Sequence, residues 1–259
     1  MSAIRAAAKS LFAAADIVRP SPSGPRVLIY HQVGTNHGHQ MEVTLEDFKR
    51  QIDWLHSERE VVDLDTALAR WSEPGADRLA VLTFDDGYSD VFTTAFPMLE
   101  DREMPFVLYV STSLIADDSA SVDGTLTWSD LEKMLASGLM TLGAHTHGHP
   151  DLRSLRAEEV EEELSTSDDV LHRRLGLRPR HFAYPYGFWS ESADAAVRQR
   201  YDTAVLGGSP RPKSVPDPYL MHRYPVQLSD GFAFFKRRVR GGFWMEESLR
   251  RKIKGYRGP

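Results

Sequence analysis

A regular alternation of two kinds of segment is the feature that most constrains the fold of this chain. Short apolar runs rich in β-forming residues are separated by stretches in which apolar residues recur at helical spacing. Repetition of strand and helix predicts a mainly parallel sheet, because each helix returns the chain to the start of the next strand. The predicted strands are 26–31, 61–64, 79–84, 106–110, 139–144, 181–184 and 203–206, and the predicted helices are 44–57, 65–71, 90–101, 128–137, 157–175 and 191–200.

The length of the chain narrows this pattern to one architecture. In a chain of 259 residues, such a series of strand–helix units fits a (β/α) barrel, either incomplete or distorted. We assign the barrel to residues 26–235. Residues 1–25 are predicted to form an amphipathic helix and a Pro-rich linker, and residues 236–259 a basic tail.

Composition excludes several classes of function. The chain has no cysteine, so it has no disulfide, thiolate metal site or cysteine nucleophile. The net charge of −6 argues against a nucleic-acid-binding protein.

The two ends of the chain are basic, which permits peripheral contact with an anionic membrane surface. Residues 236–259 carry nine Lys or Arg and two Glu. A solubilising tail packed along the domain is the simpler interpretation. Because the N-terminal stretch is a poor signal peptide, we expect a cytoplasmic location, at the periphery of the inner membrane.

Polar residues follow four of the predicted strands at the point where each strand ends. They are His31, the run Asp85-Asp86-Gly87, the histidine-rich segment 145–149, and Pro185-Tyr186-Gly187. In a (β/α) barrel the carboxyl ends of the strands meet at one mouth, where active sites are built. The sequence therefore predicts one polar site assembled from four separate strands.

The residue types at these ends suit metal-assisted hydrolysis. Adjacent acids such as Asp85 and Asp86 point different ways from the chain, so one can bind a cation while the other accepts a proton. Imidazoles with a carboxylate form a common catalytic metal site. Two histidine pairs are compatible with the spacing: His145 with His147 if the segment is extended, or His145 with His149 if a loop folds back.

These motifs resemble those of the polysaccharide deacetylase family, carbohydrate esterase family 4. Residues Thr83–Gly87 resemble the motif TFDDG, and His145–Pro150 resembles H-[ST]-x-x-H. Residues Phe182–Gly187 resemble the third motif, R-x-P-Y. Tyr30–Val33 resembles the subgroup that acts on bacterial exopolysaccharides. The similarity extends over roughly residues 26–230.

The resemblance implies a distorted (β/α) barrel and a role for each matching residue. Asp86, His145 and His149 would hold a divalent metal, most often Zn²⁺, with Co²⁺ or Ni²⁺ as other candidates. Asp85 would be the general base toward the attacking water, and the backbone N–H of Tyr186 would stabilise the oxyanion. The substrate would be an N-acetylated amino sugar in a polymer or a lipid-linked saccharide.

One position departs from the family pattern. The third motif usually begins with an arginine that pairs with the base, whereas this chain has Ala183. We expect Arg223 to supply the missing charge to Asp85. For the acid that protonates the leaving amine, the subgroup resemblance favours His31 over His222.

Two other functions remain open at this stage. The first is an amidohydrolase-type barrel enzyme that uses His145 and His147 as its histidine pair. The second is a carbohydrate-binding relative without catalytic activity, an alternative motivated by Ala183.

Overall fold

Seven parallel strands close into a barrel in the computed structural model, which describes residues 24–35, 37–118, 124–208 and 217–241. The first strand pairs with both the second and the last strand of the ring, which closes it. This confirms the predicted distorted (β/α) barrel. In order around the ring the strands are β1 (Arg26–Tyr30), β5 (Leu79–Asp86), β6 (Phe106–Val110), β7 (Met140–Ala144), β8 (His181–Ala183), β9 (Thr203–Gly207) and β10 (Met221–Pro225).

The strand β10 is the one member of the ring that the sequence pattern does not predict. It contains a histidine and an arginine, so it lacks the apolar run expected of a buried strand. Arg223 is nevertheless completely buried. Because β10 lies between β9 and β1, it is the strand that closes the barrel.

A second difference concerns the predicted strand 61–64. Only β4 (Glu60–Val61) forms there, and it pairs with the start of β5. The side chain of Asp63 accepts a hydrogen bond from the N–H of Thr66 and so begins helix α3 (Leu64–Ala69). A helix N-cap therefore ends the strand earlier than its apolar composition suggests.

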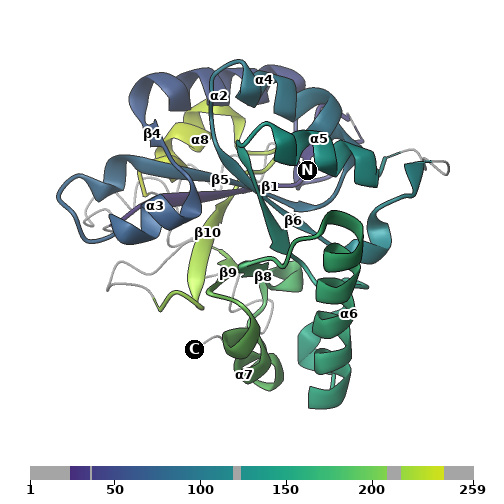
Figure 1. Cartoon of the computed structure of the whole chain (residues 1–259). Helices are drawn as coiled ribbons and strands as arrows, with labels where there is room; N and C mark the ends of the chain where they lie inside the picture. Colours follow the sequence, from purple (N-terminus) through teal and green to yellow (C-terminus); the bar gives the residue numbers. More distant parts are fainter. Residues whose placement is uncertain (1–23, 36, 119–123, 209–216, 242–259) are drawn as a thin grey trace.

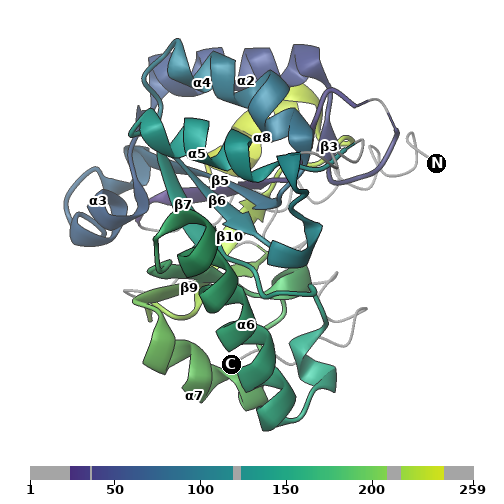
Figure 2. The same ribbon diagram turned by 45° about the vertical axis from the view of Figure 1, so that its right-hand side comes forward.

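Helices surround the barrel. Figures 1 and 2 show α2, α4, α5 and α8 on one side of it, and α6 and α7 on the other. A short parallel pair, β2 (Gln32–Val33) with β3 (Glu42–Val43), follows β1. The helices are α2 (Leu45–Glu58), η3 (Val91–Ala95) leading into α4 (Phe96–Glu100), α5 (Trp128–Ala136), α6 (Ala157–Leu175), α7 (Glu191–Arg200) and α8 (Gly231–Val239).

Helix α8 extends beyond position 235, where we placed the end of the barrel domain. Its residue Arg238 is buried and pairs with Asp230, with 2.9 Å between Nη2 and Oδ1. The carbonyl oxygen of Val239 accepts a hydrogen bond of 3.0 Å from Nε of Arg26 on β1, so the first residues of the predicted basic tail pack on the barrel. The predicted N-terminal helix with most of its linker, and the rest of the tail, lie outside the described residues. No helix in the described ranges is both long and apolar enough to cross a membrane.

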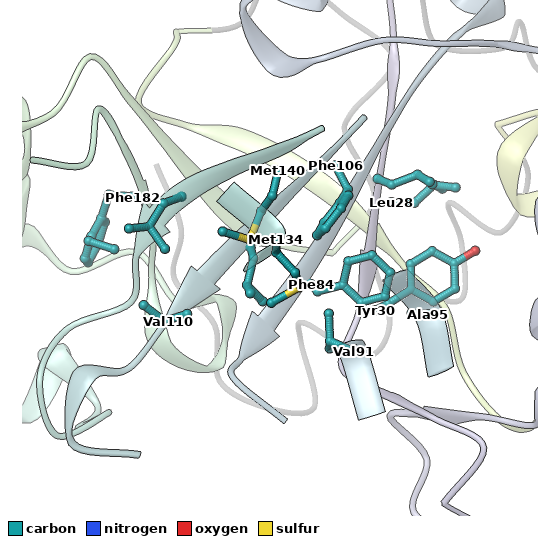
Figure 3. Packing of buried hydrophobic residues seen from close by; sticks show 14 of the residues in the cluster. Leu28, Tyr30, Phe84, Val91, Ala95, Phe106, Val110, Met134, Met140 and Phe182 are labelled. Atoms are coloured by element: carbon teal, nitrogen blue, oxygen red, sulfur yellow. The ribbon is translucent and has the colours of Figure 1, made fainter. Parts of the chain in front are cut away.

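Alternate residues of each strand serve two hydrophobic layers. The outer layer lies between the strands and the helices. There the Tyr30 ring stacks on the Phe84 ring with 5.4 Å between their centroids. The Phe106 ring contacts the Phe84 ring edge-on, with 5.8 Å between centroids (Figure 3). The inner layer fills the barrel with smaller side chains, among them Val27, Val81, Val107, Ala183 and Val205. Asp85 and Arg223 have the inward parity of this layer, so their charges are buried in the barrel.

Candidate active site

A cavity of about 740 Å³ opens at the carboxyl ends of the barrel strands. Every strand of the ring contributes to its lining, through its last residues or through the loop that follows it. This is the shared mouth that the sequence pattern predicts. The lining includes Ile29, His31, Asp85, Asp86, Leu114, His145, His149, Tyr186, Gly207 and Pro225.

The two acids at the end of β5 point to different sides. Asp85 faces the barrel interior and is 2% exposed. Asp86 has a φ of 77° and Gly87 a φ of 103°, so the chain turns sharply here. The φ of Gly87 lies in the region that residues with a Cβ rarely adopt, so glycine is favoured at this position. The turn directs the Asp86 carboxylate toward the histidines of the neighbouring loop.

Three ligand atoms converge at this point. Oδ1 of Asp86 lies 3.5 Å from Nε2 of His145 and 3.3 Å from Nε2 of His149. The two Nε2 atoms are 3.2 Å apart. Edges of about 3.3 Å are those of a tetrahedron whose ligands lie 2.0–2.1 Å from a central zinc ion. The spacing therefore suits a small cation with two nitrogen ligands and one oxygen ligand.

The hydrogen bonds around these atoms also fit a cation. Nδ1 of His145 lies 2.7 Å from the carbonyl oxygen of Ala183, so Nδ1 donates to that oxygen and Nε2 is the ring nitrogen that faces Asp86 and His149. Oδ1 of Asp86 is buried and has no hydrogen-bond partner among the described residues. A buried acceptor without a donor is costly, and a bound cation would satisfy it.

The ionisation of Asp86 and His149 agrees with this interpretation. Burial favours a higher pKa for Asp86, but the close imidazoles of His145, His31 and His149 outweigh it and hold the pKa well below its usual value. Burial and the charge of His145 lower the pKa of His149. At neutral pH the carboxylate is therefore charged and the His149 imidazole is neutral, as metal ligands must be.

The loop after β7 selects His149 rather than His147. Thr146 and His149 both adopt positive φ, 67° and 57°. Oγ1 of Thr146 accepts a hydrogen bond of 3.0 Å from the N–H of His149, which closes the loop and returns His149 toward His145. His147 turns away, and its Nδ1 lies 2.8 Å from Oγ1 of Thr112. The structure thus does not assemble the pair His145 and His147 that an amidohydrolase-type site requires.

Arg223 lies on β10, on the other side of β1 from the β5 strand that carries Asp85, and its guanidinium reaches Asp85 across the barrel interior. Its Nη1 and Nη2 donate to Oδ1 and Oδ2 of Asp85 at 2.6 and 2.7 Å, and Nη1 also donates to Oγ1 of Thr83 at 3.0 Å. Burial favours a higher pKa for Asp85, but the guanidinium and His145 outweigh it and lower the pKa. The charge that the third motif lacks at Ala183 therefore comes from β10, as the sequence analysis expects.

Of the two candidate acids, only His31 lies at the cavity; His222 does not. His31 lines the cavity, and its Nδ1 is buried without a hydrogen-bond partner among the described residues. Burial lowers the pKa of His31, opposed by Asp86 and Asp85. His222 neighbours Arg223 on β10 and so points to the opposite face of that strand. Its Nδ1 lies 3.4 Å from the carbonyl oxygen of Gly207, and it is not among the described residues that line the cavity.

Tyr186 forms the exposed wall of the cavity. It occupies a short turn, η7 (Pro185–Gly187), with a φ of 59°, and its side chain is 60% exposed. The centroid of its ring lies 4.8 Å from that of the His149 ring and 6.5 Å from that of the Phe188 ring, on which it stacks. A strained backbone and a large exposed aromatic ring beside the candidate metal ligands are typical of a functional position.

Two residues that make hydrogen bonds at the site were not predicted from the sequence. Thr83 belongs to the TFDDG-like motif, and its hydroxyl links Arg223 to the carbonyl oxygen of Leu28. Glu163 lies in the acidic run 158–163, whose sequence is typical of a solvent-exposed helix face. Its Oε2 instead accepts hydrogen bonds from the N–H groups of His147 and Gly148, at 3.0 and 2.7 Å. No local sequence signal distinguishes it from its acidic neighbours.

Comparison with protein families relates the chain to known enzymes. The profile of the polysaccharide deacetylase family matches residues 72–204. That range contains Asp85, Asp86, His145, His149 and Tyr186, whereas His31 and Arg223 lie outside it.

Among related sequences, the Bacillus subtilis protein YxkH is 23% identical over 220 residues, which cover 82% of this chain and 74% of YxkH. The poly-beta-1,6-N-acetyl-D-glucosamine N-deacetylase of Staphylococcus epidermidis is 25% identical over 170 residues. That alignment covers 61% of this chain and 58% of the staphylococcal enzyme.

Solved structures show the same fold. IcaB from Ammonifex degensii superposes with a TM-score of 0.73 at 25% identity, covering 85% of this chain and 98% of IcaB. The Streptococcus pyogenes deacetylase PplD superposes with a TM-score of 0.71 at 22% identity, covering 84% of this chain and 98% of PplD. The second likeness is one of fold alone.

Proposed function

Because this chain belongs to the polysaccharide deacetylase family, we propose that it is a metal-dependent hydrolase of N-acetyl groups on amino sugars. The observation that carries the proposal is the convergence of Asp86, His145 and His149 beside the buried pair Asp85–Arg223. These residues provide cation ligands and a charged carboxylate in one cavity. We infer Zn²⁺ as the resident metal, since the ligand set is two imidazoles and one carboxylate.

In this proposal Asp85 is the general base. When bound, the metal supplies Lewis acidity toward the acetyl carbonyl and lowers the pKa of the attacking water. Asp85 is held as a carboxylate by Arg223, and both of its oxygens are oriented by the two N–H donors of the guanidinium. Fixed orientation and a charged state are what a base needs in order to accept a proton from the attacking water.

Tyr186 and His31 complete the proposed set. The backbone N–H of Tyr186 donates to the oxyanion that forms at the acetyl carbon, a contribution of about 3 kcal/mol for one such donor. His31 protonates the departing amine from the β1 side of the cavity. Because burial lowers its pKa, the resting imidazole is neutral at pH 7, so it takes up one proton from solvent and passes it to the amine nitrogen as the C–N bond breaks.

The cavity suits an acetylated amino-sugar polymer. Met41, Leu114, Tyr186 and Phe188 line the cavity with apolar surface that fits the C–H faces of sugar rings. The substrate in the names of the staphylococcal relatives, poly-beta-1,6-N-acetyl-D-glucosamine, is therefore the first polymer to assay. A lipid-linked saccharide, reached from a membrane surface through the basic ends of the chain, is the second.

Metal analysis followed by an acetate assay tests the proposal. We expect about one zinc-like ion per purified wild-type chain after dialysis, none in His149→Ala, and wild-type content in His147→Ala. Acetate release from acetylated amino-sugar polymers should then depend on that ion. Absence of bound metal in wild type after addition of Zn²⁺, Co²⁺ or Ni²⁺ would refute metal dependence. Polymer binding without acetate release, with metal present, would support a non-catalytic role.

A further inference from the structure

Glu163 is a side chain of helix α6 that reaches the loop holding two of the candidate metal ligands. Its Oε2 accepts hydrogen bonds from two successive backbone N–H groups, those of His147 at 3.0 Å and Gly148 at 2.7 Å. A Cβ on Gly148 would lie 3.2 Å from Oε1 of Glu163. The absence of a side chain at Gly148 thus allows the carboxylate to approach the loop closely.

The opposite edge of the loop is held by the segment after β6. Oγ of Ser111 donates to the carbonyl oxygen of His145 at 2.8 Å, and the N–H of Thr112 donates to that of Thr146 at 3.2 Å. The N–H of Ser113 donates to the carbonyl oxygen of His147 at 3.0 Å. This segment therefore binds the carbonyl groups of the loop, and Glu163 binds its N–H groups.

The loop needs such support because its conformation is unfavourable by itself. Thr146 and His149 both lie in the left-handed region, which residues other than glycine rarely adopt. An extended backbone would separate His149 from His145 and Asp86. Hydrogen bonds to a charged carboxylate are about twice as strong as those to a neutral acceptor, so Glu163 is well suited to stabilise the folded-back form.

We propose that Glu163 is a positioning residue that holds the 145–149 loop closed and thereby sets the metal affinity of the site. It acts through the backbone of His147 and Gly148 and is not among the residues that line the cavity. The inference rests on the metal site of the proposed function. Outer partners of metal ligands typically change metal affinity 10- to 100-fold when they are removed.

A metal titration without substrate tests this inference. Metal-free wild type, Glu163→Ala and Glu163→Gln are titrated with Zn²⁺ against a competing chelator, with Glu162→Ala as the matched control because that neighbouring acid is exposed. We expect the Zn²⁺ dissociation constant to rise about 10- to 100-fold in Glu163→Ala. A smaller rise is expected in Glu163→Gln, which keeps an acceptor but loses the charge. The control should match wild type.

A second readout separates positioning from general stability. The visible absorption of bound Co²⁺ should weaken or shift in Glu163→Ala, while kcat and KM at saturating metal should return to near wild-type values. Equal Zn²⁺ affinity in wild type and both Glu163 variants would overturn the inference and leave the proposed function intact. Failure of wild type to bind metal would instead refute the metal site itself. If Glu163→Ala does not fold, Glu163→Gln decides the question.

Discussion

At the scale of single residues, the main feature of the site is a pair of opposite charges buried away from water. Asp85 and Arg223 are 2% and 0% exposed, and they form two short hydrogen bonds with each other. Each charge is tolerated in the barrel only because the other is present. The same pair gives Asp85 its low pKa and its fixed direction, so stability and chemistry depend on the same contact.

Asp85→Asn should abolish turnover and leave metal binding intact. The amide keeps the shape of the side chain but cannot accept a proton, and Asp85 is not one of the three converging ligands. The check is acetate release together with metal content. Loss of metal in this variant would reassign Asp85 to the ligand set, and wild-type turnover would remove it from the mechanism.

Arg223→Ala should destabilise the protein by about 3–5 kcal/mol, because it leaves a buried carboxylate without its partner. The pKa of Asp85 should also rise, since burial is then less opposed. The base must be deprotonated, so the acid limb of kcat/KM should move to higher pH.

Thermal unfolding and a pH–rate profile measure these two effects, with exposed Arg173→Ala as the control. A depressed pKa adds stability that is lost as pH falls through the folded value. The stability difference between wild type and Arg223→Ala should therefore shrink at low pH. An unchanged acid limb would contradict the assigned role of Arg223.

At the scale of secondary-structure elements, the β2–β3 pair and η3 bury the carboxylate of Asp90. Asp90 precedes η3, it is 8% exposed, and its Oδ1 has no hydrogen-bond partner among the described residues. Burial raises the pKa of Asp90 to about 7, and the nearby Glu42 on β3 acts in the same direction, against a hydrogen bond from the backbone of Val33. The β2–β3 pair therefore packs against an acid that titrates near neutral pH.

Asp90→Asn should stabilise the protein more at pH 8 than at pH 5. A carboxyl group with a raised pKa binds more protons in the folded state, so stability falls as pH rises from about 4 toward 7. The amide removes this dependence. Melting temperatures at both pH values should show a gain a few degrees larger at pH 8. Exposed Asp77→Asn serves as the control, and equal gains at both pH values would contradict the raised pKa.

Closure of the whole barrel brings together residues from its first and last strands in the sequence. His31 follows the first strand of the ring and Arg223 lies in the last, 138 residues along the chain from Asp85. Both lie outside the region that the family profile matches. They meet the central residues because β1 pairs with both β5 and β10. The candidate metal ligands likewise come from β5 and from the loop after β7.

Removal of metal should lower the melting temperature of the whole protein. A ligand at 100 times its dissociation constant stabilises the folded state by about 2.7 kcal/mol, or roughly 5–10 °C for a domain of this size. Unfolding of wild type with and without a chelator measures the shift. His149→Ala should show no shift, and an equal shift in that variant would indicate that the metal binds elsewhere.

The barrel, the end of it that carries polar residues and the chemical types at that end could all be predicted from the amino-acid sequence. These follow from local periodicity and from the rule that parallel strands end at one mouth. The charge at Arg223 was expected on chemical grounds, because Ala183 left the base without a cation.

Which of these groups lie in contact could not be predicted, because it depends on how distant segments pack. The choice of His149 over His147 depends on positive φ values at two non-glycine residues, which local propensity disfavours. The arginine of β10 is tolerated inside the barrel because it pairs with Asp85, 138 residues away in the sequence, and the composition of β10 does not show this. Glu163 resembles its solvated neighbours until α6 packs beside the loop. In each case the deciding interaction joins residues far apart in the chain or overrides a local preference.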